Sequence, residues 1–252
     1  MRNVLAIAEK EIRTYFASPI AYVIIGLFTL LFGWIFFAYL SYFLRNSEQM
    51  MGGGNVNVNQ QVISGVLQTC AVIVLFVMPM ITMRTYSEEK RSGTIELLLT
   101  SPVTDIQIIL GKFLGALALY VAMLSVTVLY VLLLFWYGNP EWRPIVAGYL
   151  GLLLMGGCFL SVGLLVSSLT KNQIVSAIGT FAVFLFLWMI NWNVDSSGPT
   201  TREILNYLSI TEHFGDFARG IIDTKHVIYY LSFITFGLFL TAKSVDSERW
   251  RG

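Results

Sequence analysis

Charged residues are scarce in this 252-residue chain. They make up 12% of it, about half of the roughly 25% that is typical of a soluble domain. The 16 Lys and Arg residues nearly balance the 15 Asp and Glu residues, so no basic excess favours a nucleic-acid partner. Hydrophobic residues account for 56% of the chain, and the mean hydropathy is +0.71. Because the apolar residues are grouped in long runs, the composition predicts an integral membrane protein.

Residues that carry catalysis or bind metals are also scarce. The two cysteines, Cys70 and Cys158, lie inside apolar runs, which favours small buried side chains over a disulfide or a metal site. His213 stands near Glu212 and Asp216, and this small set favours structural hydrogen bonding over metal binding. The sequence contains no H-E-x-x-H, no G-x-S-x-G and no G-x-x-x-x-G-K-[ST] motif. We therefore expect no catalytic residue, no metal site and no bound cofactor, and any ATP must be hydrolysed on another polypeptide.

Six apolar runs are each about the length needed to cross a bilayer. A hydrocarbon core of about 30 Å takes about 20 residues of helix, and an open sheet cannot satisfy its backbone in lipid. The expected spans are 21–44, 62–83, 113–136, 145–169, 174–192 and 226–242, of which the last is the shortest. The sequence therefore predicts a single all-α transmembrane domain over residues 1–252.

The positions of Lys and Arg predict the orientation of these spans. If the N-terminus is cytoplasmic, eleven of the sixteen basic residues fall in cytoplasmic segments, as the positive-inside rule requires. These eleven are Arg2, Lys10, Arg13, Arg84, Lys90, Arg91, Lys112, Lys171, Lys243, Arg249 and Arg251. The other five are Arg45, Arg143, Arg202, Arg219 and Lys225. We therefore expect both termini to be cytoplasmic.

Residues 1–18 have the pattern of an amphipathic helix, with apolar side chains on one side and charged side chains on the other. Such a helix lies along the inner leaflet, and Pro19 lets the chain turn into the first span. An ordinary membrane anchor is the simpler function. A contact with a cytoplasmic partner, made through Lys10 and Arg13, is the alternative.

Residues 193–225 combine apolar residues at helical spacing with too many charges for a span. We expect one or two short amphipathic helices here, before the last span, lying on the outer surface or dipping into the membrane.

We expect the six spans to be free of Asp, Glu, Lys, Arg and His. Ionisable groups inside a membrane usually mark proton relays or ion paths. Their absence argues against an ion-coupled carrier and against an intramembrane enzyme.

The densest charge lies in residues 84–104, between the second and third expected spans. The run from Glu88 to Arg91 is expected to continue the second helix until Gly93 breaks it. A short helix then follows, with Thr94 as its N-cap, and it must end before Pro102.

The third span is expected to start with the T-x-x-Q capping box formed by Thr104 and Gln107.

A helix of about six residues is far too short to be stable alone. The short helix after Gly93 carries Ile95, Leu97, Leu98 and Leu99. These apolar side chains must be buried in the membrane surface, in the groove of a partner protein, or in both. Two functions remain open on this ground. The segment is either a loop helix that lies on the bilayer or a coupling helix that docks into another protein.

The stretch YSEEKRSGTIELLLTSP resembles the E-K-x-x-G-T-x-E-x-L…P pattern of the ABC-2 family of ATP-binding-cassette transporter permeases. The pattern is matched by Glu89, Lys90, Gly93, Thr94, Glu96, Leu98 and Pro102. The stretches EKEIRTYFASPIAYV, LTKNQIVSAI and HFGDFARGIIDTKHVIYY, with the six-span layout, resemble the gliding-motility-type branch of that family.

The resemblance implies the permease subunit of an exporter in a bacterial inner membrane. In that family, a coupling helix between spans two and three inserts into a cleft of a separate nucleotide-binding subunit, which holds ATP and Mg²⁺. A second copy of the chain or a related membrane subunit completes the assembly. The residues implied to contact the ATPase are Glu88, Glu89, Lys90, Arg91, Gly93, Thr94, Ile95, Glu96, Leu97, Leu98 and Pro102. The alternative function is a membrane scaffold that anchors the ATPase, transmits force and moves no cargo.

Overall fold

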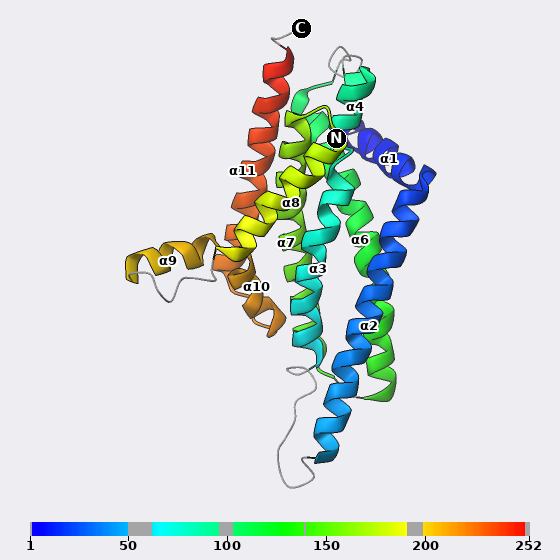
Figure 1. The fold of residues 1–252 in the computed structure, drawn as a ribbon, viewed down its shortest axis with the longest axis vertical. Helices are drawn as coiled ribbons and strands as arrows, with labels where there is room; N and C mark the ends of the chain where they lie inside the picture. Colours follow the sequence, from blue (N-terminus) through cyan, green and yellow to red (C-terminus); the bar gives the residue numbers. More distant parts are fainter. Residues whose placement is uncertain (1, 50–61, 96–102, 139, 191–198, 250–252) are drawn as a thin grey trace.

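A computed structural model describes residues 2–49, 62–95, 103–138, 140–190 and 199–249, and every regular element within these ranges is helical (Figure 1). The elements are α1 (Arg2–Ala17), α2 (Pro19–Gln49), α3 (Ser64–Thr82), α4 (Ser87–Ser92), α6 (Asp105–Tyr137), α7 (Trp142–Leu169), α8 (Gln173–Met189), α9 (Pro199–Leu208), α10 (Ile210–Ala218) and α11 (Thr224–Arg249). The long helices form an elongated bundle, and α1, α4 and the C-terminal end of α11 gather at one end of it.

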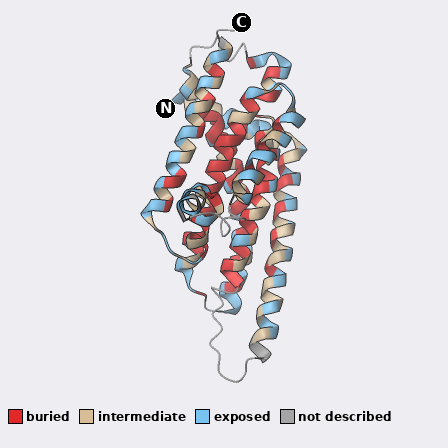
Figure 2. Ribbon diagram, turned by 60° about the vertical axis from the view of Figure 1, so that its left-hand side comes forward, coloured by how far each residue is buried: buried red, intermediate tan, exposed pale blue. Residues whose placement is uncertain are grey.

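Helix α7 lies at the centre of this bundle. In its most apolar 18-residue window, 72% of the residues are buried inside the chain, against 28% for α2 and 22% for α11. Figure 2 shows the buried residues gathered on the inner helices. Helices α2 and α11 therefore offer most of their apolar surface to lipid or to another membrane helix.

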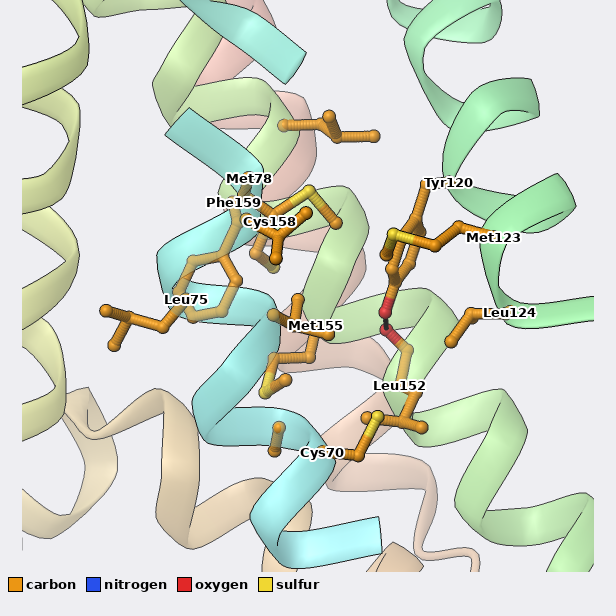
Figure 3. Close-up of a cluster of buried hydrophobic side chains, with 14 of the residues drawn as sticks. Cys70, Leu75, Met78, Tyr120, Met123, Leu124, Leu152, Met155, Cys158 and Phe159 are labelled. Atoms are coloured by element: carbon orange, nitrogen blue, oxygen red, sulfur yellow. Dashed lines mark hydrogen bonds between the residues drawn. The ribbon is translucent and has the colours of Figure 1, made fainter. Parts of the chain in front are cut away.

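Tyr120 joins α6 to α7 in the middle of the core (Figure 3). Its hydroxyl donates a hydrogen bond to the backbone oxygen of Leu152 at 2.8 Å. Its ring lies against Gly156, where a Cβ atom would overlap it. Cys70 and Cys158 are fully buried and unbonded to each other, which confirms that they act as small core side chains.

The turn from α1 into α2 has the predicted location. Helix α1 ends at Ala17 and α2 begins at Pro19, which is the helix position that proline tolerates best. Ser18 lies between them, and its hydroxyl accepts a hydrogen bond from the backbone N–H of Ile20 at 3.4 Å.

Helix α1 crosses α6 at two glycines. A Cβ atom added at Gly111 would lie 2.6 Å from the Cβ of Ile7, and one at Gly115 would lie 2.6 Å from the Cβ of Glu11. Small residues at this spacing let two helices approach closely. The pair therefore serves packing within the chain and places Glu11 beside α6.

The long helices differ from the six expected spans. In the part of the chain that the structure describes, five helices are long and apolar enough to cross a membrane, and α8, with 17 residues, is shorter than these. Residues 191–192 of the expected fifth span lie outside the described ranges. Helix α11, expected to be the shortest span, has 26 residues because the polar sequence after residue 242 continues the helix.

Helix α6 also begins earlier than the expected span 113–136, and so it includes Lys112. His226 lies in the first turn of α11. The expectation that the spans lack ionisable side chains is therefore wrong for α6, which includes Asp105 and Lys112, and for the last span, which begins with His226.

The segment expected to form one or two short helices forms two, α9 and α10. Helix α10 packs against α3, α7 and α8, and Figure 1 shows it beside the bundle while α9 projects sideways. Ser209 separates the two helices and caps α10, because its hydroxyl accepts a hydrogen bond from the N–H of Glu212 at 3.4 Å.

Replacing Gly111 with Leu should displace α1 from α6. The new side chain would overlap Ile7, and overpacking of this kind costs about 1–3 kcal/mol. We expect a lower thermal unfolding midpoint and faster tryptic cleavage within α1. The matched control is Gly26→Leu, because Gly26 has no atom within 4 Å of the Cβ position. Equal midpoints for the two variants would contradict the crossing.

Candidate functional site

The charged run after α3 forms the separate short helix α4. The charged run continues the second candidate span, which extends over Ser64–Ser92 as predicted, but Met83–Tyr86 make a turn that separates α4 from α3. Helix α7 stabilises the turn: the hydroxyl of Ser167 accepts hydrogen bonds from the N–H groups of Tyr86 (3.1 Å) and Ser87 (3.2 Å). The first N–H groups of a helix have no partner inside it, so Ser167 determines where α4 begins.

Helix α4 ends at Gly93, as predicted. Gly93 has φ 73° and ψ 0°, the left-handed conformation in which glycine is favoured. Thr94 is itself helical rather than an N-cap outside the helix, and its hydroxyl lies 2.9 Å from that of Ser92. Thr94 therefore bonds back toward α4.

The capping box at the start of α6 is confirmed. The Thr104 side chain accepts from the backbone of Gln107, whose side chain in turn accepts from the N–H of Thr104 at 3.4 Å. The other residues implied for the coupling helix, Glu96, Leu97, Leu98 and Pro102, lie outside the described residues.

A buried ammonium group joins α4 to α1 and α6. The side chain of Lys112 is 1% exposed, and its Nζ atom lies 2.9 Å from Glu11 Oε1, 2.8 Å from Glu89 Oε1 and 3.0 Å from the backbone oxygen of Thr85. An ammonium group has three N–H donors, and each has a partner here. The same Nζ atom lies 5.1 Å from the centre of the Tyr86 ring.

The two carboxylates are balanced by two cations. Lys10 of α1 also reaches Glu89, with Nζ 3.4 Å from Oε1. Glu11, Glu89, Lys10 and Lys112 thus form a cluster with no net formal charge, which we call the Lys112 cluster. Charges withdrawn from water are stable only when paired in this way.

A second buried lysine joins α4 to the opposite side of the bundle. The side chain of Lys90 is 3% exposed, and its Nζ atom lies 2.7 Å from Glu248 Oε1 of α11. It also donates a hydrogen bond to the backbone oxygen of Ser168 in α7. Successive residues on a helix point about 100° apart, so the adjacent Glu89 and Lys90 hold α4 from two sides.

The end of α4 that faces away from the bundle is exposed. Glu88, Arg91, Gly93 and Thr94 are all exposed, whereas Ile95 is 8% exposed and belongs to the core. Ile95 was expected to need the membrane surface or a partner's groove, yet it is buried within the chain itself. The exposed tip of α4, formed by Glu88, Arg91, Ser92, Gly93 and Thr94, is available for contact with another molecule.

A cavity of about 490 Å³ opens between α1 and α4. Its charged lining residues include Lys10, Glu11, Arg84, Glu88 and Glu89. Positively and negatively charged side chains therefore both line the cavity, next to the exposed tip of α4.

Two α1 residues near this cavity differ in their surroundings. Tyr15 lines the cavity, with its hydroxyl 3.3 Å from that of Thr85, and burial raises its pKa above the usual tyrosine value. Arg13, predicted to contact a partner, is 79% exposed and pairs only with its helix neighbour Glu9, at 2.6 Å, among the described contacts.

Sequence reasoning did not identify Lys112 or Glu11 as part of this site. They are 101 residues apart, and no local pattern links them. The available signal was Gly111-x-x-x-Gly115, which indicates a close helix crossing but not its partner helix. Within the described ranges, no group of three or more His, Cys, Asp or Glu residues could hold a metal ion.

Replacing Lys112 with Met should destabilise the protein by about 3–5 kcal/mol, because two carboxylates would remain near each other without their buried cation. The measurement is thermal or chemical unfolding in detergent or nanodiscs. Adding Glu11→Gln and Glu89→Gln to Lys112→Met should restore part of the stability. Arg13→Met is the control, since loss of an exposed ion pair costs at most about 1 kcal/mol. Equal stability of Lys112→Met and Arg13→Met would contradict the role of the cluster.

The geometry can be compared with known proteins. A family model described as an ABC-2 family transporter protein matches residues 5–242. The proteins called "Probable multidrug ABC transporter permease YbhR" in Escherichia coli K12 and in Escherichia coli O157:H7 are each 27% identical to the chain over 153 residues. The match covers 60% of this chain but only 41% of each relative. Since the family model covers nearly all of the five membrane-spanning candidates and the helices between them, the chain belongs to the ABC-2 transporter family.

Proposed function

We propose that the chain is the permease subunit of an ABC-2 exporter, driven by a separate nucleotide-binding ATPase. The ATPase contacts the exposed tip of α4 and the adjoining residues 95–102. Closure of the ATPase around ATP pushes on α4, and the bundle rocks in response. The chain itself carries neither the nucleotide site nor the catalytic residues.

The observation that carries this proposal is the attachment of α4 to four helices. Glu89 connects it to α1 and α6 through Lys10 and Lys112, and Lys90 connects it to α7 and α11. A loop helix that only rested on lipid would not need two buried ion pairs. A force applied at the tip would instead reach both sides of the bundle, because a packed interior transmits strain.

The same proposal also assigns the number of spans and the orientation of the helices in the membrane. Helix α8 supplies a sixth span. The bundle end that carries α1, α4 and the end of α11 is cytoplasmic, in agreement with the excess of Lys and Arg there, and the membrane is the inner membrane of a bacterium. Lys10 and Arg13 add a second contact with the ATPase.

A second copy or a related membrane subunit pairs with this chain, and the cargo passes between the two. The curated relatives have multidrug permease in their name, which favours export of a small molecule, while the stretches quoted above favour the gliding-motility-type branch. A scaffold that moves no cargo shares the same α4 contact. A transportable molecule that stimulates the ATPase distinguishes export from the scaffold.

Reversing the charge of Arg91 should uncouple the complex. Arg91 is exposed at the tip, so Arg91→Glu changes the proposed contact surface without touching the Lys112 cluster. We expect the stimulation of the partner ATPase by the reconstituted permease to fall about tenfold, the effect of losing about 1.4 kcal/mol of contact energy. ATPase activity in nanodiscs, with the ATPase encoded beside this gene, is the measurement.

The matched control for Arg91→Glu is Arg143→Glu, an exposed arginine in the first turn of α7. It should leave the stimulation unchanged. If both variants retain full stimulation while the unfolding midpoints stay equal, the contact at α4 is refuted.

The orientation can be tested with cysteines, because both native cysteines are buried. Ser92→Cys, at the tip of α4, should react with a membrane-impermeant maleimide only from the cytoplasmic side. Glu141→Cys, at the N-terminal end of α7, should react only from outside. The reverse pattern would overturn the assigned topology.

A further inference from the structure

The two histidines of the chain lie in one hydrogen-bonded row with Asp216. They are the only histidines present, and each is 6% exposed. His226 Nε2 lies 2.8 Å from Asp216 Oδ2, the two Nδ1 atoms lie 2.6 Å apart, and His213 Nε2 lies 2.9 Å from the backbone oxygen of Tyr207. The row joins α9, α10 and α11. The hydrogen-bond acceptors at its two ends, the Tyr207 backbone oxygen and the Asp216 carboxylate, determine which ring nitrogens carry a hydrogen.

The row needs one proton more than two neutral imidazole rings carry. The Tyr207 oxygen can only accept, so His213 carries its hydrogen on Nε2. The ionised Asp216 can also only accept, so His226 carries a hydrogen on Nε2. A neutral imidazole has one N–H and one acceptor nitrogen. Two neutral rings would therefore point two lone pairs at each other across 2.6 Å. An additional proton between the Nδ1 atoms turns this repulsion into a hydrogen bond.

The Asp216 carboxylate lies at the His226 end of the row. Burial lowers the pKa of His213, and the nearby Lys225 and His226 lower it further, while its bond to Tyr207 and the charge of Glu212 act in the opposite direction. His226 instead bonds directly to the carboxylate of Asp216, so the negative charge that balances a proton shared by the two rings lies beside His226.

Aromatic and other titratable side chains hold the two rings in place. The Tyr229 ring stacks on His213 at 3.9 Å, and the Tyr207 ring meets it edge-on at 5.6 Å. The hydroxyls of Tyr229 and Tyr230 donate to the backbone oxygens of Leu208 and Ile210.

The remaining titratable groups are further from the shared proton. Cys158 of α7 faces the row through Tyr230, whose backbone oxygen lies 3.4 Å from its Sγ atom. The exposed Lys225 pairs with Asp223 at 3.2 Å. Neither group competes for the nitrogen atoms of the row, so the proton between the rings remains the only link between their Nδ1 atoms.

We propose that Asp216, His226 and His213 form a binding site for a single proton, and that this proton locks α10 to the start of α11. A second proton would make His213 Nδ1 a donor and break the contact. Loss of the shared proton would leave two opposed acceptors. The two helices therefore stay joined at this point only while the pair of rings holds one proton.

The site lies at the opposite end of α11 from the α4 attachment. His226 and Glu248 are separated by 22 residues of helix, or about 33 Å, and Glu248 bonds to Lys90. The proton site therefore acts on the helix that holds α4. The proposal itself does not depend on what α4 contacts, because it rests on the row alone.

Nitrogen NMR of the protein in lipid bilayers tests the site directly. Labelling histidine with ¹⁵N reports only His213 and His226. At pH 7.5 we expect one doubly protonated ring, one neutral ring protonated on Nε2, and a correlation between the two Nδ1 atoms. Two neutral rings without this correlation would overturn the proposal.

Two variants separate the proton site from ordinary packing. Asp216→Asn removes the balancing charge and should weaken or abolish the signal of the doubly protonated ring at pH 7.5. Glu212→Gln, on the same helix, should leave the doubly protonated ring in place. Equal spectra for wild type and Asp216→Asn would refute the role of the carboxylate.

A metal site is the competing outcome. One equivalent of Zn²⁺ at pH 7.5 should leave the Nδ1 signals unchanged. If Zn²⁺ shifts both of them stoichiometrically, the pair binds a metal instead and the proposal fails. ATPase stimulation is not used as a readout, so a failure of the permease proposal and a failure of the proton site are distinguishable.

Discussion

The arrangement at the α4 end depends on the burial of Lys112. An ammonium group at 1% exposure is stable only if each of its donors has a partner, and the partners come from α1 (Glu11), α4 (Glu89) and the turn before α4 (Thr85). The two glycines of α6 make this geometry accessible, because they let α1 approach within contact distance. The charged segment is thereby held against the bundle rather than left in solvent.

Helix α11 connects the two ends of the molecule. Its C-terminal part meets α4 through the pair of Glu248 and Lys90, and its first turn contains His226. The first contact is an ion pair and the second is a hydrogen bond to a carboxylate, and each has one buried partner. Helix α11 is therefore held at its ends by polar contacts and along its length by packing against α7.

Membership in the ABC-2 family and the all-helical bundle agree with each other, and they place the function in transport. The bonds of α4 add what membership alone does not: the particular residues through which this segment is attached. Its two neighbouring residues of opposite charge, Glu89 and Lys90, contact different helices. The motif E-K thus has a structural role in this chain in addition to the contact proposed for the exposed tip.

The sequence alone determined the helical class, most of the long apolar helices, the Pro19 turn, the Gly93 helix end and the Thr104–Gln107 capping box, because each depends on periodicity or on neighbours within four residues. The family pattern also marked α4. Only the tertiary structure decided that Ile95 is buried in the chain, that Lys112 pairs with Glu11, and that His213 meets His226. These contacts join residues from different helices, and the free energy of burying a charge depends on which partner reaches it, which no local pattern encodes.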